Sequence, residues 1–344
     1  MASSDDDTLP TPVEDKHLPH DYDALTPDTV LDAVESVGLV VDARILALNS
    51  YENRVYQVGI DEQEPVIVKF YRPNRWTDEA ILEEHSYSDM LAEHEIPVIA
   101  PSKNEEGKSL HTYNGYRFAL FPRKGGYAPE VGDLDQLSWL GRLMGRIHAV
   151  GSTAPFTARP TLDVNTYCRE PSKYLLEHDF IPGNYVDEYR AITTDIADTA
   201  VEIINSVNNL KWIRCHGDCH VGNILWQRDH GPHFVDFDDC QTAPAIQDLW
   251  MLLAGDRQEK TIQLSEILDQ YTEYFEFNAA EIKLIEPLRA LRMVHYAGWL
   301  ARRWTDPAFP MYFTWFNTSQ YWMQHLGEIR EQLVQMTKEP LRWF

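Results

Sequence analysis

The chain has 344 residues, of which 44% are hydrophobic and 12% aromatic, enough to bury the core of one large domain or of two lobes. Its 54 acidic and 30 basic side chains give a formal net charge of −24. This charge repels phosphate backbones and anionic lipids, which argues against nucleic acids and membrane surfaces as general partners. The charge does not name a substrate, because an acidic surface also serves solubility.

The distribution of apolar residues and cysteines favours a cytoplasmic protein. There is no run of about eighteen apolar residues, and the first residues lack the basic and apolar regions of a secretory signal. The few cysteines have no scaffold-like spacing, which indicates reduced thiols. Residues 1–20 are acidic and poor in apolar side chains, so we expect a disordered tail outside the fold.

Residues 26–72 predict a helix followed by antiparallel strands. Thr26 followed by Pro27 is typical of a helix cap and first turn, and the expected helix ends at Gly38. Three segments then combine β-branched and aromatic residues and are separated by short polar turns. These strands are expected at residues 43–50, 53–60 and 66–72.

A second helix and three more strands complete the expected small lobe. Apolar positions recur every three or four residues between positions 75 and 95, which predicts one long helix. A turn at Asn114 and Gly115 joins two of the further strands. These strands are expected at residues 98–103, 109–113 and 116–122.

The rest of the chain predicts a linker and then a mainly helical lobe. Residues 123–132 have the glycine and proline content of a connection. Residues 212–239 predict short strands around tight turns. Helical periodicity is found at residues 134–151, 186–210, 279–304 and 319–336.

The segment HGDCHVGNILW carries the strongest chemical signal. Asp218 and Asn223 are five residues apart, and Asp236 follows an apolar run thirteen residues further on. This spacing matches a kinase catalytic loop, where one carboxylate orients and deprotonates the acceptor hydroxyl while oxygen ligands hold Mg²⁺. We assign the first role to Asp218, and metal binding to Asn223 and Asp236. Each residue alone also suits an ordinary turn or strand end, but their order and spacing favour catalysis.

Two cysteines and two histidines in the same segment allow an alternative, a zinc site. All four side chains can ligate zinc; they are Cys215, His216, Cys219 and His220. Adjacent cysteine and histidine cannot easily face one tetrahedral ion, and the sequence has no comparable cluster elsewhere. We expect instead that His216 packs beneath the loop and orients Asp218.

Alternation along the strand at residues 66–72 places Lys69 on a face toward a cleft or solvent. In kinases such a lysine binds the α- and β-phosphates and is held by a helix glutamate. We choose Glu84 as that partner because it lies on the apolar face of its helix, and Glu83 remains possible. Without the downstream motif, Lys69 would suit an ordinary strand charge.

The chain contains neither GxGxxG nor GxxxxGK, which disfavours a P-loop fold. The segment LNSYENRVYQV instead lies where a nucleotide-covering hairpin is expected. Ser50 and Asn53 in this segment can donate hydrogen bonds to phosphate oxygens. A plain polar turn is the alternative for either residue.

These motifs resemble those of the aminoglycoside and choline phosphotransferase superfamily, through HGDCHVGNILW, FVDFDD and GRLMGRIHAVG. More narrowly, the chain resembles the stress response kinase A family. That resemblance covers nearly the whole chain after residue 25 and is carried by HGDCHVGNILW together with NSYENRVYQV, VIVKFYRPNRWT, EEHSYSDMLAEHEIPV, QDLWMLLAG and RWTDPAFP.

The resemblance implies a bilobal, protein-kinase-like fold and Mg²⁺-dependent use of ATP to phosphorylate protein serine or threonine, including autophosphorylation. It assigns the catalytic acid/base to Asp218, the magnesium ligands to Asn223 and Asp236, and the nucleotide-loop serine to Ser50. Asp236 also counts as an active-site residue in the family. The acidic tail and the stretch at residues 230–233 are longer than the family leads us to expect.

The superfamily leaves the acceptor open, because most members phosphorylate small alcohols or amino sugars. Our first hypothesis is a monomeric serine/threonine kinase of stress response. The alternatives are a kinase acting on a sugar, choline-like or amino alcohol, and an inactive nucleotide-binding module. Acceptor choice should depend on C-terminal helices, although aromatic residues at helical spacing more often form core; the residues in question are Arg292, His295, Tyr296, Trp299, Arg303 and Trp304.

The expected organisation is α+β and bilobal. An antiparallel sheet lobe with one main helix binds the nucleotide, and a larger, mainly helical lobe carries catalysis and the acceptor. The predicted parts are the tail at 1–20, the nucleotide-binding lobe at 21–122, the linker at 123–132 and the helical lobe at 133–344.

Overall fold

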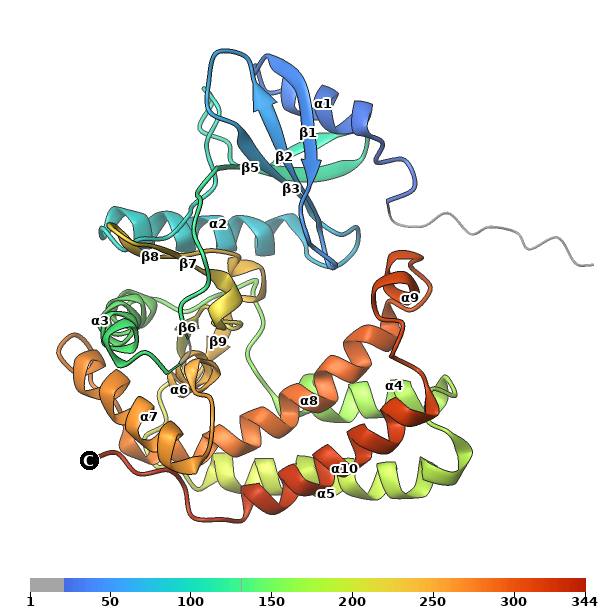
Figure 1. Cartoon of the computed structure of the whole chain (residues 1–344), viewed down its shortest axis with the longest axis vertical. Helices are drawn as coiled ribbons and strands as arrows, with labels where there is room; N and C mark the ends of the chain where they lie inside the picture. Colours follow the sequence, from blue (N-terminus) through green and yellow to red (C-terminus); the bar gives the residue numbers. More distant parts are fainter. Residues whose placement is uncertain (1–21, 131) are drawn as a thin grey trace, which may run out of the picture.

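The computed structural model describes residues 22–130 and 132–344, so the tail expected at residues 1–20 lies outside the described part of the chain. The described residues form two lobes joined by an extended segment (Figure 1). The smaller lobe contains an antiparallel sheet, and the larger lobe is mainly helical. The predicted bilobal α+β fold is therefore confirmed.

The sheet of the N-terminal lobe has the strand order β1-β2-β3-β5-β4, and each neighbouring pair is antiparallel. Its strands are β1 (Val41–Ala47), β2 (Arg54–Ile60), β3 (Val66–Phe70), β4 (His111–Tyr113) and β5 (Tyr116–Pro122), and its helices are α1 (Pro27–Glu35) and α2 (Asp78–Glu93). The prediction of a strand at residues 98–103 is wrong. Val98 makes only an isolated bridge to Phe234, and prolines 97 and 101 lack the amide hydrogens that a ladder needs.

Strand β3 separates the two faces of this sheet. Val68 and Phe70 point into a core shared with α1, whereas Tyr71, just after the strand, packs with Ile81 of α2 on the other side. Because side chains alternate along a strand, Lys69 shares the α2 side. The sequence pattern of β3 thus places one buried lysine between the sheet and α2.

The C-terminal lobe consists mostly of helices. They are α3 (Leu134–Gly151), α4 (Glu170–Glu177), α5 (Val186–Asn205), α6 (Ile246–Leu249), α7 (Arg257–Tyr271), α8 (Ile285–Arg302), α9 (Ala308–Tyr312) and α10 (Ser319–Met336). Two glycines allow α3 to approach α7 closely: a Cβ on Gly141 would lie 2.4 Å from the Ile267 carbonyl oxygen, and one on Gly145 2.5 Å from that of Tyr271. A second core, around Trp322, joins α4, α5, α8 and α10.

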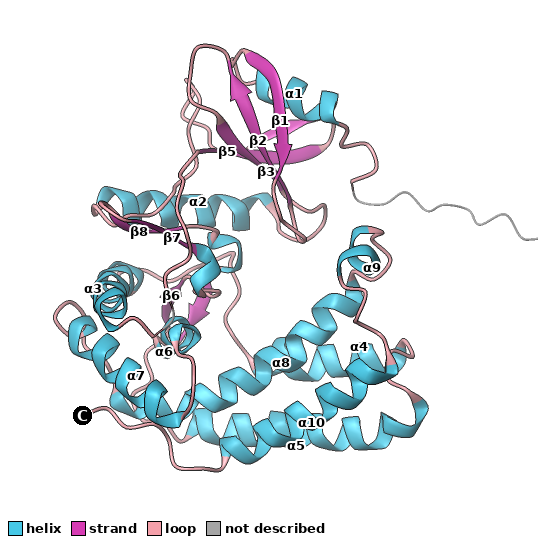
Figure 2. Ribbon diagram, in the orientation of Figure 1, coloured by secondary structure: helices cyan, strands magenta, loops and turns pink. Residues whose placement is uncertain are grey.

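Two small antiparallel strand pairs lie between α2 and the helices of the larger lobe (Figure 2). They are β6 (Ile213–Cys215) with β9 (Gln241–Ala243), and β7 (Ile224–Gln227) with β8 (Gly231–Phe234). Short strands were expected in this region, and they position the HGDCHVGNILW segment. Among the described residues, no helix has the length and apolarity to span a bilayer.

Candidate active site

The β7/β8 hairpin brings Asn223 and Asp236 to the same end of one structural unit. Ile224 pairs with Phe234, and the Val235 amide donates a 3.0 Å hydrogen bond to the Asn223 carbonyl. Asp236 follows directly, in a left-handed backbone conformation with φ 61° and ψ 64°. Non-glycine residues held in this region are often functional. The hairpin therefore explains why a gap of thirteen residues places two metal-ligand candidates close together.

Asp218 lies on the loop just before this hairpin and is connected to it. The Asn223 side-chain nitrogen donates to the Asp218 carbonyl over 3.0 Å. The Asp218 carboxylate lies 2.7 Å from a guanidinium nitrogen of Arg292 and 3.5 Å from the Nε2 atom of His220. Burial alone would raise the pKa of Asp218, but His220 and Arg292 hold it well below its ordinary value. Asp218 is thus an ionised carboxylate, the form a proton acceptor needs.

A buried carboxylate, Asp248, fixes the backbone of the HGD segment. Its oxygens accept hydrogen bonds from the amides of His216 and Gly217 at 2.7 and 2.8 Å, and a third contact comes from His148 at 3.0 Å. Gly217 has φ +86°, and a Cβ there would lie 2.0 Å from the Asp239 carbonyl oxygen, so only glycine fits.

His216 lies beneath the loop, as expected. Its Nε2 atom contacts the Val235 carbonyl at 2.9 Å and its Nδ1 atom accepts from the Asp218 amide at 3.4 Å. The four Cys and His residues of the zinc alternative do not form a ligand cluster in the described part of the chain. The cluster found there instead combines Cys215 with His148 and Asp248, all buried.

Lys69 lies at the centre of a group of carboxylates between the lobes. Its ammonium nitrogen is 3.0 Å from Asp236, 3.1 Å from Asp238 and 3.4 Å from Glu84. Burial would lower the pKa of Lys69, but these carboxylates raise it well above its ordinary value, so the lysine stays charged. Glu84 is therefore the helix partner, because Glu83 accepts hydrogen bonds from Thr157 and from the amides of residues 158 and 159.

The loop between β1 and β2 carries Ser50 and Asn53, the two residues expected to contact phosphates. The Ser50 hydroxyl donates to the Asn53 carbonyl over 3.0 Å within the loop. The Asn53 side chain is buried, and its Oδ1 atom accepts from the Arg72 amide over 3.1 Å. This hydrogen bond joins the β1–β2 loop to the residue that follows β3.

Sequence comparisons identify related phosphotransferases and kinases. Residues 44–284 match the model described as "Phosphotransferase enzyme family". The chain is 44% identical over 321 residues to stress response kinase A of Escherichia coli (strain K12), covering 93% of this chain and 96% of that protein. A relative from Salmonella typhimurium named serine/threonine protein kinase RdoA is 43% identical with the same coverage. The chain belongs to the phosphotransferase enzyme family, in its stress response kinase A branch.

Solved structures of other phosphotransferases share the fold. An amicoumacin kinase solved with AMP-PNP, Ca²⁺ and Ami superposes with a TM-score of 0.69 at 19% identity, covering 92% of this chain and 96% of that one. A microcompartment-associated aminopropanol kinase gives 0.68 at 15% identity, with 89% and 96% covered. These structures show the kinase-like fold. The family and the relatives named as kinases make the protein an ATP-dependent phosphotransferase.

Sequence reasoning missed two charged residues of this phosphotransferase's cleft. Asp238 is buried and paired with both Lys69 and Arg75, and Arg75 also contacts Asp239. The FVDFDD segment contained the signal, since it carries three acidic residues, but only the fold shows that Asp236 and Asp238 face the same lysine. Asp236 keeps 52% of its side chain exposed, whereas Asp238 keeps 5%, so Asp236 is the carboxylate open to a ligand.

The donor set at the hairpin fits a magnesium ion. The nitrogen of the Asn223 amide is occupied by the Asp218 carbonyl, so its oxygen is the atom left to face a cation. Asp236 adds an exposed carboxylate. Oxygen ligands from one or two side chains, with phosphates completing the shell, are the usual environment of Mg²⁺ in phosphotransferases.

A cluster of buried and partly buried charges, which we call the interlobe clasp, joins the β1–β2 loop and the segment after β3 to the end of α8 and the turn between α8 and α9. Glu52 contacts Arg303 at 2.5 Å and Arg72 at 3.1 Å, and accepts from the Trp299 indole at 2.6 Å. Arg72 also contacts Asp306 at 2.9 Å. The clasp therefore holds the β1–β2 loop against the C-terminal lobe, through residues far apart in sequence.

Proposed function

We propose that this protein is a Mg-ATP-dependent serine/threonine protein kinase that also phosphorylates itself. The observation that carries the proposal is that four of the predicted site residues are connected. Asn223 donates a hydrogen bond to the Asp218 carbonyl, and Lys69 forms an ion pair with Asp236. These are the groups that phosphoryl transfer requires: a base for the acceptor hydroxyl, metal ligands and a phosphate-binding cation.

In the proposed mechanism Asp218 orients the acceptor hydroxyl and takes its proton. Lys69, held by Glu84, binds the α- and β-phosphates of ATP. Asn223 and Asp236 would hold Mg²⁺, which when bound offsets the negative charge of the phosphates. Positioning and electrostatics supply most of the rate, because the transferred group needs little covalent help.

The protein acceptor is supported by the relative named a serine/threonine protein kinase at 43% identity over most of both chains. The second candidate is a small-molecule kinase acting on a sugar, choline-like or amino alcohol. It is supported by the fold, which is shared with kinases named for small acceptors.

Transfer of labelled γ-phosphate from Mg-ATP separates these functions. Wild type and Asp218→Ala are incubated with a cell extract depleted of, or replete in, metabolites, and label is followed in protein and small-molecule pools. Label on protein that depends on Asp218 supports the protein kinase. Label only in a metabolite supports the second candidate, and label in neither pool leaves an inactive nucleotide-binding module.

A further inference from the structure

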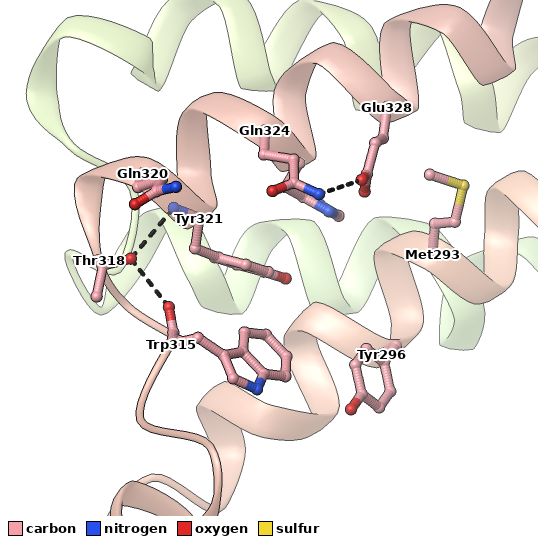
Figure 3. Close-up of a pocket in the computed structure, with 9 residues that line it drawn as sticks. Met293, Tyr296, Trp315, Thr318, Gln320, Tyr321, Gln324 and Glu328 are labelled. Atoms are coloured by element: carbon pink, nitrogen blue, oxygen red, sulfur yellow. Dashed lines mark hydrogen bonds between the residues drawn. The ribbon is translucent and has the colours of Figure 1, made fainter.

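A cavity of about 570 Å³ lies between α8 and the start of α10. It is lined by none of the residues assigned to phosphoryl transfer. Its walls include Tyr296 of α8, Trp315 of the loop before α10, and Tyr321, His325 and Glu328 of α10. Figure 3 shows the rings of Trp315, Tyr321 and Tyr296 arranged around one space.

The aromatic walls of this cavity are not all core. Tyr296 is 41% exposed and Trp315 is 45% exposed. The rings of Trp315 and Tyr321 have centroids 5.3 Å apart with planes at 44°, so they form two sides of a corner. Exposed aromatic faces that meet in this way attract cations, because the ring quadrupole is negative over the face.

The polar groups of the cavity also favour a cation. Glu328 is a carboxylate, and the Gln324 amide orients it through a 2.7 Å hydrogen bond. No lysine or arginine is among the described residues that line the cavity. His325 adds no charge at neutral pH, because burial lowers its pKa to about 4. Its Nε2 atom is buried without a hydrogen-bond partner among the described residues.

Helix α8 carries both a contact to Asp218 and part of the wall of the cavity. Arg292 contacts Asp218, and Tyr296 lies one turn further along α8, about 6 Å along the helix axis. The Tyr296 ring stacks on Trp299 with centroids 5.6 Å apart, and the Trp299 indole donates to Glu52 of the β1–β2 loop. Helix α8 therefore links the residue that contacts Asp218 to the wall of the cavity.

We propose that this cavity binds a lysine or arginine side chain of the protein acceptor, two or three residues from the phosphorylated hydroxyl. The inference rests on the proposed function and specifies its substrate. Two or three extended residues span about 7–10 Å, which exceeds the rise of about 6 Å from Arg292 to Tyr296 along α8. The net charge of −24 also attracts basic acceptors.

Matched serine peptides test this assignment. Each peptide carries arginine, or neutral isosteric citrulline, at one position within three residues of a single serine. Wild type should prefer one arginine peptide over its citrulline partner by about tenfold in kcat/KM. Glu328→Gln and Trp315→Leu should reduce that preference to about twofold. Glu331→Gln, an exposed residue on the same helix, is the matched control and should keep the preference.

A binding measurement that does not depend on transfer separates this inference from the proposed function. N-acetyl-arginine amide should bind wild type and Glu331→Gln, by calorimetry, more tightly than Glu328→Gln, with equal thermal stability of all three proteins. The inference is overturned if N-acetyl-arginine amide binds Glu328→Gln and Glu331→Gln equally, or if wild type uses arginine and citrulline peptides equally. This holds even if γ-phosphate label still appears on protein. If wild type binds N-acetyl-arginine amide more tightly than Glu328→Gln but γ-phosphate label appears only on a small amino alcohol, the cavity is a cation site and the protein acceptor is overturned.

Discussion

Arg292 places a guanidinium nitrogen 2.7 Å from Oδ1 of Asp218. A helix of the acceptor side thus contributes a fixed positive charge to the carboxylate proposed as the catalytic base. This contact stabilises the ionised form of Asp218 and orients it, which gives Arg292 a positioning role.

Arg292→Gln should lower kcat by about ten- to a hundredfold, because Asp218 loses both its orientation and part of its charge stabilisation. The KM for ATP should change little, since the ion pair that Arg292 makes among the described residues is with Asp218 and not with a residue assigned to the nucleotide. Without the cation the pKa of Asp218 rises, so the acidic limb of the kcat/KM profile should move to higher pH. Arg292→Lys should restore part of both effects, and an unmoved acidic limb would contradict the role.

Asp236→Asn should abolish transfer, because the exposed carboxylate proposed as a metal ligand is lost. Chelation of divalent metal with EDTA should do the same to wild type, and added Mg²⁺ should reverse it. Initial rates against Mg²⁺ concentration are the measurement. Near-normal turnover of the variant at saturating Mg²⁺ would reject the assignment.

Glu52→Gln should weaken the interlobe clasp. Removing one partner of a buried ion pair leaves its cations uncompensated and typically costs about 3 kcal/mol of unfolding free energy. The freed β1–β2 loop should also raise the KM for ATP. Urea unfolding and ATP titration of transfer rates measure these effects, with Glu64→Gln, an exposed residue between β2 and β3, as control. Equal stability of the two variants would show that the clasp contributes nothing.

His85 makes stability depend on pH. Burial is the main cause that lowers its pKa from 6.5 to about 3, and its ring contacts Tyr71 and Ser109 at 2.7 and 2.8 Å. The unfolded chain then binds a proton below pH 6.5 that the folded chain does not, so stability from this group falls as pH falls. The stability advantage of wild type over His85→Gln should shrink by up to about 1.4 kcal/mol per pH unit below 6.5. Urea unfolding at pH 7.5 and 5.5 gives the comparison, and a constant difference would contradict it.

Local patterns predicted the fold and much of the candidate site. Alternation along β3 and the apolar face of α2, together with the downstream kinase-like motif, favoured Glu84 as the partner of Lys69 and left Glu83 possible, because these periodicities are set by backbone geometry. The spacing of Asp218, Asn223 and Asp236 predicted their grouping, since a catalytic loop followed by a hairpin has little freedom in length. These residues lie on a loop and a hairpin whose backbone conformation is set by neighbouring residues in the sequence.

Contacts between distant elements were not predictable in the same way. Arg72 and Asp306 are 234 positions apart, and nothing in either segment specifies the other. The hydrogen bond from the Arg72 amide to Asn53 Oδ1 was likewise not predictable, and a contact of Asn53 with phosphate stays a prediction. The division into lobes at residues 21–122, 123–132 and 133–344 stays a prediction.

The clasp also bears on how the two lobes can move. The segment that follows β5 runs from the smaller to the larger lobe on one side of the molecule, and α9 lies on the other side, near the β1–β2 loop (Figure 1). The clasp joins the lobes on that second side. The segment after β5 is itself held, because Tyr127 and Trp226 exchange backbone hydrogen bonds of 3.1 and 2.7 Å. The two lobes are therefore connected at two places, covalently by the segment after β5 and non-covalently by the clasp. We expect the exchange of ADP for ATP to begin when Glu52 separates from Trp299 and Arg303. If phosphoryl transfer is faster than this separation, the separation limits the turnover rate.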